Sequence, residues 1–309
     1  MIDRIGIEGE PLAELVQSGS IWYIYGAKLG LSAIEGDEGI ALTQMSLGAF
    51  LHITSFEPEA WVNQLTDIDR LAGVGHLEIW FEWLPGDRRE LDSVKSVLAG
   101  RRTVVHAPFI GLSIASQWRD LRAISVSRII ECCRTAAVIG AELVSIHPGP
   151  VPVYEDRQSA LDTVASSYEE IRHAAGITGV ALENLFTGYG VCVNAASRLD
   201  DLIYISEMIA DMKITLDIGH CVQNDEDYIS FLSKNIDMVS NIHLHDATVG
   251  GRAHMRLGTG SVELGSFLDA CLTSGYRGFI GLETLTAADT EASWQMIQSH
   301  LDGASEVST

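Results

Sequence analysis

The chain has 309 residues, of which 47% are hydrophobic, so it can bury a substantial core and is neither a disordered chain nor a small disulfide-stapled scaffold. Its 42 acidic and 20 basic residues give a formal net charge of −22, which argues against binding to long nucleic acids or anionic membranes. Five cysteines without a Cys-x-x-Cys pair, and no apolar run of the roughly 18 residues that a membrane span needs, predict a cytoplasmic protein.

Residues 1–43 precede the first predicted strand, and we expect them to form a short N-terminal arm of unknown role. Beyond them, short apolar runs alternate with longer segments of helical periodicity, which is typical of a parallel sheet. Eight such runs predict strands at 46–51, 77–81, 103–106, 143–147, 179–183, 214–217, 239–243 and 279–283. Eight strand-helix units in residues 44–309 predict a single-domain (β/α)8 TIM barrel of the α/β class. An open doubly wound sheet is the alternative, but no glycine-rich phosphate loop follows a strand.

One connecting segment, residues 125–140, shows the helical pattern clearly. Apolar residues recur along it at helical spacing, and Gly140 is placed to end the helix. The stripe that we expect to be buried consists of Val126, Ile129, Ile130, Cys133, Ala137 and Val138.

Side chains alternate between the two faces of a strand, so each predicted strand has an outer and an inner set. In the last five strands one set is aliphatic, as a surface covered by helices requires. The other set ends in a residue that can bind a metal: His147, Glu183, Asp217, His243 and Glu283, with His106 on the third strand. Because the C-terminal ends of barrel strands meet at one mouth, we expect these residues to converge there.

The converging carboxylates would repel one another and lose hydration unless a cation lay among them. Any one of these residues could simply cap a loop, but together they predict a divalent metal. The mixed oxygen and nitrogen ligands suit Mn or Zn, with Co or Mg as further candidates. The loop histidines His220 and His254 extend the site. Arg252 and Arg256 could meet an anionic group of a substrate, and Glu78 could line its pocket.

Seven short motifs resemble, in order, those of the xylose isomerase-like barrels, a family that includes sugar epimerases, sugar-phosphate isomerases and endonuclease IV. They are Val105-His106-Ala107-Pro108, Ile146-His147-Pro148-Gly149, Leu182-Glu183-Asn184, Leu216-Asp217-Ile218-Gly219-His220, His243-Leu244-His245-Asp246, His254-Met255-Arg256-Leu257-Gly258-Thr259-Gly260 and Leu282-Glu283-Thr284. The resemblance does not cover the N-terminal arm.

The resemblance implies roles for the residues at the ends of the strands. Glu183, Asp217, His243 and Glu283 match the four metal ligands of the single-metal isomerases and epimerases. In that subgroup the two glutamates also act as the base and the acid on either side of a substrate carbon. His220 matches a histidine that contacts the substrate.

The resemblance to endonuclease IV implies further metals. A second metal there takes residues that match His106, His147 and Glu183. A third takes the equivalents of the two loop histidines and an aspartate, whose position Arg252 occupies in this chain. Because an arginine would repel a third cation, three-metal chemistry on DNA is disfavoured.

Three functions follow as hypotheses, each with a small molecule as partner and with a homo-oligomer left open. The first is a metal-dependent isomerase or epimerase that moves a proton at a carbon of a sugar, sugar phosphate or similar hydroxy-carbonyl compound, with Glu183 and Glu283 as catalytic residues. The second is a metal-dependent phosphoesterase related to endonuclease IV, which the retained His106 and His147 favour; the net charge then favours a small phosphodiester over duplex DNA. The third, a barrel that binds without turnover, does not need both glutamates.

Overall fold

The computed structural model describes residues 4–5, 13–18, 21–25, 45–52, 59–176, 179–188 and 190–307. The chain divides into two compact units, residues 1–37 and 38–309. In the first unit, strands β1 (Arg4–Ile5), β2 (Ala13–Ser18) and β3 (Ile21–Tyr25) form an antiparallel sheet in that order. The other positions of the predicted arm, which spans residues 1–43, lie outside the described residues.

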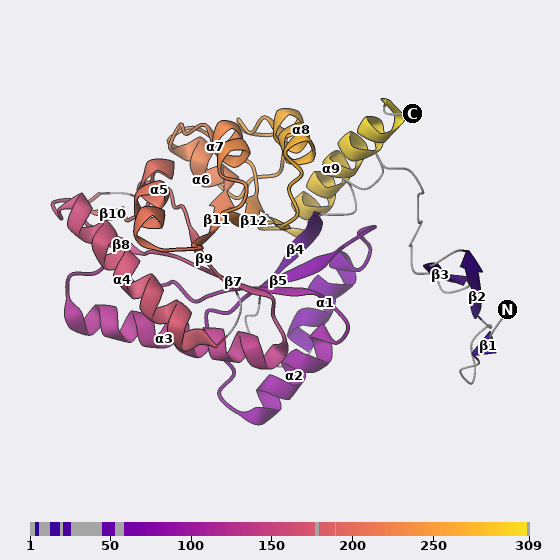
Figure 1. Cartoon of the computed structure of the whole chain (residues 1–309), viewed down its shortest axis with the longest axis horizontal. Helices are drawn as coiled ribbons and strands as arrows, with labels where there is room; N and C mark the ends of the chain where they lie inside the picture. Colours follow the sequence, from indigo (N-terminus) through magenta and orange to yellow (C-terminus); the bar gives the residue numbers. More distant parts are fainter. Residues whose placement is uncertain are drawn as a thin grey trace. The chain divides into compact units, whose positions relative to one another are not determined.

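The second unit is a closed barrel of parallel strands surrounded by helices (Figure 1). Its strands pair in chain order, and β13 pairs with β4 to close the barrel. They are β4 (Ser46–His52), β5 (His76–Trp80), β6 (Thr103–His106), β7 (Leu143–Ile146), β9 (Val180–Glu183), β11 (Lys213–Asp217), β12 (Val239–Leu244) and β13 (Phe279–Leu282). The predicted (β/α)8 barrel is therefore confirmed, and each predicted strand end differs from the observed one by at most one residue.

Helices connect these strands and cover the outside of the barrel. They are α1 (Glu59–Ile68), α2 (Arg88–Leu98), α3 (Arg119–Ile139), α4 (Arg157–Ala175), α5 (Leu199–Met208), α6 (Ile218–Gln223), α7 (Tyr228–Lys234), α8 (Leu264–Ser274) and α9 (Ala287–Val307). Aspartates cap several of them: Asp87, Asp156 and Asp227 each accept a backbone N–H from the first turn. Two short strands, β8 (Pro150–Pro152) and β10 (Cys192–Asn194), pair outside the barrel.

Helix α3 differs from its prediction in two respects. It begins at Arg119 rather than at residue 125, although it does end before Gly140, whose φ of 81° lies in the left-handed region. Its buried residues are Ser125, Val126, Ile129, Cys132, Cys133 and Ala136, whereas Ala137 and Val138 are exposed. Val138 follows Cys133 by five residues, which places it about 140° further around the helix and away from the barrel.

The two faces of the strands separate as predicted. The aliphatic set, which includes Val144, Leu182 and Ile242, is buried in the main hydrophobic core with residues of the surrounding helices. Inside the barrel, Val104, Leu143, Ala181 and Phe279 form a separate apolar cluster. The chain thus places an apolar floor below the polar residues that lie nearer the C-terminal mouth.

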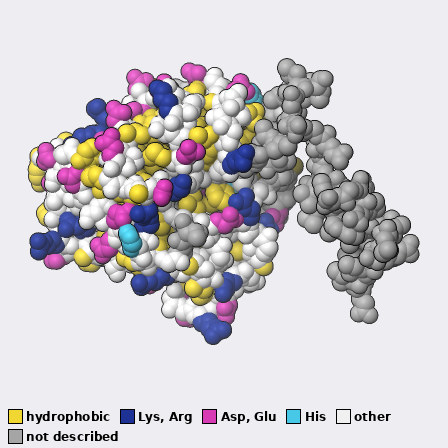
Figure 2. All heavy atoms as spheres, in the orientation of Figure 1, with side chains coloured by type: hydrophobic (Ala, Val, Ile, Leu, Met, Phe, Trp, Pro, Cys, Tyr) yellow, Lys and Arg dark blue, Asp and Glu magenta, His cyan; other side chains and the backbone are white. Residues whose placement is uncertain are grey.

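The outer surface carries charges of both signs, interspersed over the face shown in Figure 2. Among the described helices, none combines the length and hydropathy that crossing a bilayer requires.

Candidate metal centre

Four predicted ligands from consecutive barrel strands meet at the mouth, and we call Glu183, Asp217, His243 and Glu283 the central cluster. Glu183 and Asp217 end β9 and β11, His243 lies on β12, and Glu283 follows β13 directly. The Nδ1 atom of His243 lies 3.3 Å from Glu183 Oε1, 3.4 Å from Glu283 Oε2 and 3.8 Å from Asp217 Oδ2. Three of the four side chains are fully buried, and Glu283 is 18% exposed.

The central cluster fits a divalent cation by two criteria. First, His243 Nδ1 and Glu283 Oε2 are buried, and neither has a hydrogen-bond partner among the described residues. Such an unpartnered buried group costs about 1–3 kcal/mol, which a bound cation would offset. Second, His243 Nδ1 lies 3.3 Å and 3.4 Å from oxygens of Glu183 and Glu283, close to the roughly 3.4 Å between ligands bound about 2.1 Å from a tetrahedral ion. Three overlapping sets of residues at the mouth also have potential ligand atoms within 4.8 Å of one another: His106, Glu183 and His243; Glu183, Asp217 and His220; Asp217, His245 and Glu283.

Glu78 orients His243 from below. Its Oε1 lies 2.9 Å from His243 Nε2, and its Oε2 accepts a hydrogen bond of 3.1 Å from Asn241 Nδ2. Glu78 is fully buried, so the expectation that it lines the substrate pocket is wrong. Because Glu78 engages Nε2, Nδ1 of the same ring is left to face the carboxylates, as in the carboxylate–histidine–metal arrangement.

Asp217 is fixed by hydrogen bonds on both its backbone and its side chain. Asn184 donates from Nδ2 to Asp217 O at 3.0 Å and accepts from Asp217 N at 2.8 Å. The carboxylate accepts the backbone N–H of His220 at 2.6 Å, and its Oδ2 lies 3.2 Å from His245 Nε2. These contacts leave the carboxylate little freedom to turn away from His243.

His106 and His147 form a second group that shares Glu183 with the central cluster. Their Nε2 atoms lie 3.1 Å apart, and Glu183 Oε2 lies 3.4 Å from His106 Nε2 and 3.3 Å from His147 Nε2. The other oxygen, Oε1, faces His243. His106 Nδ1 is 2.9 Å from Ala107 O and donates to it, so the neutral ring keeps a lone pair on Nε2. Glu183 is therefore placed to bridge two cation positions.

Opposite charges compensate one another in this buried site. Burial by itself would raise the pKa of Glu183, but His243 and His147 hold that pKa well below its ordinary value. Burial by itself would lower the pKa of His243, but Glu183 and Glu78 raise it well above 6.5. Burial raises the pKa of Glu283, and the nearby imidazolium of His243 does not cancel this effect. The neighbouring imidazoles thus favour the charged form of Glu183, and a bound divalent cation would favour it in the same way.

The loop histidines lie beside the central cluster, as predicted. His220 Nδ1 lies 3.3 Å from Asp217 Oδ2, and His254 Nδ1 lies 3.7 Å from Glu283 Oε1. Both histidines line a cavity that also contains Arg252. Arg256 is exposed, and the described lining of this cavity does not include it.

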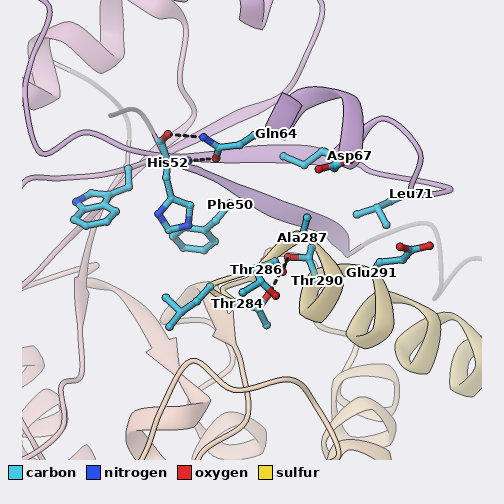
Figure 3. Close-up of a pocket in the computed structure, with 13 residues that line it drawn as sticks. Phe50, His52, Gln64, Asp67, Leu71, Thr284, Thr286, Ala287, Thr290 and Glu291 are labelled. Atoms are coloured by element: carbon cyan, nitrogen blue, oxygen red, sulfur yellow. Dashed lines mark hydrogen bonds between the residues drawn. The ribbon is translucent and has the colours of Figure 1, made fainter. Parts of the chain in front are cut away.

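His52 is a residue at the mouth that the sequence analysis did not identify. It ends β4 and lines a cavity of about 350 Å³ that reaches Asp67 on α1 and Glu291 on α9 (Figure 3). Gln64 holds its backbone, accepting from His52 N at 3.1 Å and donating to His52 O at 3.0 Å. Burial lowers the pKa of His52, while Glu283 acts to raise it. The signal was present, because His52 shares the inward face of its strand with Phe50.

The protein is thus a (β/α)8 barrel with buried imidazoles and carboxylates gathered at its C-terminal mouth. Residues 42–302 match the family model described as xylose isomerase-like TIM barrel, and the chain belongs to this family. An uncharacterized protein of Methanocaldococcus jannaschii is 28% identical over 210 residues, which cover 66% of this chain and 71% of that protein.

Solved structures of an epimerase-like protein and of an endonuclease IV share this fold. A D-tagatose 3-epimerase-like protein matches with a TM-score of 0.71 and 23% identity over 86% of this chain and 100% of its own. Endonuclease IV from Thermus thermophilus matches with a TM-score of 0.62 and 21% identity over 84% of this chain and 99% of its own. At these identities the similarity shows the fold alone.

Proposed function

We propose that the chain is a divalent-metal-dependent isomerase or epimerase that moves a proton at a carbon of a small hydroxy-carbonyl compound, such as a sugar or sugar phosphate. The observation that carries the proposal is the placement of two glutamates in one metal-type cluster. Glu183 and Glu283 come from the first and last of four consecutive strands, and each has an oxygen within 3.4 Å of His243 Nδ1. Membership of a family with epimerase structures supports the proposal.

The central cluster would hold the cation, which when bound polarises a carbonyl and an adjacent hydroxyl and so acidifies the neighbouring C–H. Glu183 and Glu283 approach the bound substrate from different strands, so one removes a proton from carbon and the other delivers one. Glu78 and Asn184 keep His243 and Asp217 in position during this exchange. The imidazoles at the mouth are available to hydrogen-bond substrate hydroxyls.

Solvent deuterium tests this proposal. Metal-loaded protein is incubated in deuterated water with a panel of ketoses, aldoses and sugar phosphates, and we expect deuterium at the isomerised or epimerised carbon. Glu183→Gln and Glu283→Gln should each reduce incorporation by about 100-fold or more, with metal content measured in parallel because both residues are proposed ligands. Glu82→Gln is the matched control, since Glu82 accepts backbone N–H groups of Phe109 and Ile110 instead. Absence of exchange with every compound would overturn the proposal.

A second candidate, a metal-dependent phosphoesterase, is favoured by one specific observation. His106 and His147 converge on the Glu183 oxygen that faces away from His243, which suits a pair of cations that bind a phosphate and activate water. This candidate predicts two bound metals and hydrolysis of a small phosphodiester such as bis(p-nitrophenyl) phosphate. His106→Ala and His147→Ala should then abolish hydrolysis and remove one metal, whereas the isomerase should keep its metal in both variants.

A further inference from the structure

A second cavity opens at the mouth on the side of the loop histidines, with a volume of about 380 Å³. Its described lining consists of Phe186, His220, Gln223, Gly251, Arg252, Ala253 and His254. None of these residues is acidic, although acidic residues outnumber basic ones by 42 to 20 in the chain. The cavity beside His52 in Figure 3 contrasts with it, because Asp67 and Glu291 line that cavity.

Arg252 stands on a turn that is held from both sides. Its backbone N–H donates to Thr248 Oγ1 at 3.0 Å, and its carbonyl accepts from Thr248 N at 2.9 Å. Gln223 ties the same turn to α6: its carbonyl accepts from Gly250 N at 2.9 Å, and its Nε2 donates to Gly251 O at 2.6 Å. The backbone of Arg252 is therefore fixed beside the cavity, which lowers the entropy lost when a ligand binds.

His254 is held in a strained conformation that presents its ring to the mouth. Its φ of 51° lies in the left-handed region, which costs a non-glycine residue on the order of 1–3 kcal/mol. The hydrogen bond of 3.0 Å from His254 N to His245 Nδ1 helps to hold this conformation. His254 Nδ1 is buried without a hydrogen-bond partner among the described residues, because Glu283 Oε1 at 3.7 Å lies beyond hydrogen-bond distance, and this nitrogen is therefore available to a ligand.

A cation does not suit this cavity. His220, His245 and His254 lie close enough together to share an ion. However, both ring nitrogens of His245 already have partners, Asp217 Oδ2 at 3.2 Å and His254 N at 3.0 Å. Two histidines then remain as ligands, and the permanent charge of Arg252 in the same lining would repel the ion. The donors of the guanidinium match the oxygens of an anion instead.

We propose that Arg252, together with His220 and His254, binds an anionic group of the substrate, either a carboxylate or a phosphoryl group. The substrate is therefore a charged hydroxy-carbonyl compound, whose reacting carbon lies at the central cluster while its charged end lies in the cavity. The inference rests on the proposed function in calling the ligand a substrate, whereas anion binding itself does not require turnover.

Titration of the manganese-loaded protein with inorganic phosphate, and separately with acetate, tests the site. We expect Arg252→Ala to raise the dissociation constant for at least one probe by about 10- to 100-fold, and Arg252→Lys to restore part of the loss. Arg88→Ala is the control, since Arg88 lies on α2, is 92% exposed and carries the same charge. Unchanged binding in Arg252→Ala, or an equal loss in Arg88→Ala, would overturn the inference.

The deuterium panel separates the failure of this inference from that of the proposed function. Exchange with sugar phosphates, or with hydroxy-keto acids added to the panel, that falls in Arg252→Ala, with little effect on neutral sugars, supports both. Exchange with neutral sugars alone would overturn the inference that the substrate is anionic, but it would still support the proposed isomerase function. Anion binding that depends on Arg252, without any exchange, would support the anion site and overturn the proposed isomerase function.

Discussion

Replacing Glu78 by Gln tests whether this buried carboxylate prepares His243 to bind a metal. Glutamine keeps the shape of the side chain but removes the negative charge 2.9 Å from His243 Nε2. Both His243 Nε2 and Asn241 Nδ2 donate to Glu78, so the NH2 group of the glutamine would face a hydrogen-bond donor at one of these two positions. Loss of such a carboxylate partner typically costs 10- to 100-fold in metal affinity, or about 1.4–2.7 kcal/mol. We expect the dissociation constant for Mn²⁺ to rise by that factor.

Competition with a fluorescent chelator measures this affinity, and thermal unfolding of the metal-free proteins separates it from general destabilisation. Glu82→Gln serves again as the control, because its carboxylate bonds to backbone N–H groups of the loop after β6 and should leave metal affinity unchanged. Equal affinity of Glu78→Gln and the unaltered protein would refute the role assigned to Glu78.

Two further perturbations have defined outcomes. Chelation of a metal present at 1,000 times its dissociation constant should lower the free energy of unfolding by about 4 kcal/mol. For a domain of roughly 260 residues this corresponds to a fall of about 7 °C in the melting temperature, which calorimetry measures. An unchanged melting temperature would contradict a metal site in the native state. Gly219→Ala should destabilise by about 1–3 kcal/mol in urea unfolding and weaken metal binding, because the new Cβ would overlap the His245 ring that contacts Asp217. Gly303→Ala, in α9 with open space around it, should be neutral or stabilising by up to about 1 kcal/mol, and an equal loss in both variants would refute the overlap argument.

The barrel could be predicted from the sequence because its strands carry a strong local signal. In the last five of them a purely aliphatic face alternates with a face that carries small and polar residues, such as Ser145 and Thr215, whose hydroxyls bond across the interior at 2.8 Å. The short strands β8 and β10 were missed, because three-residue strands lack a readable period and pair across residues distant in the sequence. The exposed Val138 shows that apolar spacing alone does not fix which face of a helix is buried.

The metal-type residues could be placed together because parallel strands bring their C-terminal ends to one mouth. What could not be predicted is the contact each side chain makes across the barrel. Glu78 and His243 lie 165 positions apart in the chain, and only the curvature of the closed sheet brings the carboxylate under the imidazole. The alternation of β4 does place His52 on the inward face, but its proximity to Glu283 depends on the closure of the barrel between the two ends of the sheet.

Anomalous diffraction from crystals of the manganese-loaded protein tests the metal centre most directly. We predict a peak bounded by Glu183, Asp217, His243 and Glu283, with Glu78 still bonded to His243. A second peak between His106 and His147 would shift the balance toward the phosphoesterase. The absence of a peak within the central cluster, in protein shown to be folded, would contradict the account.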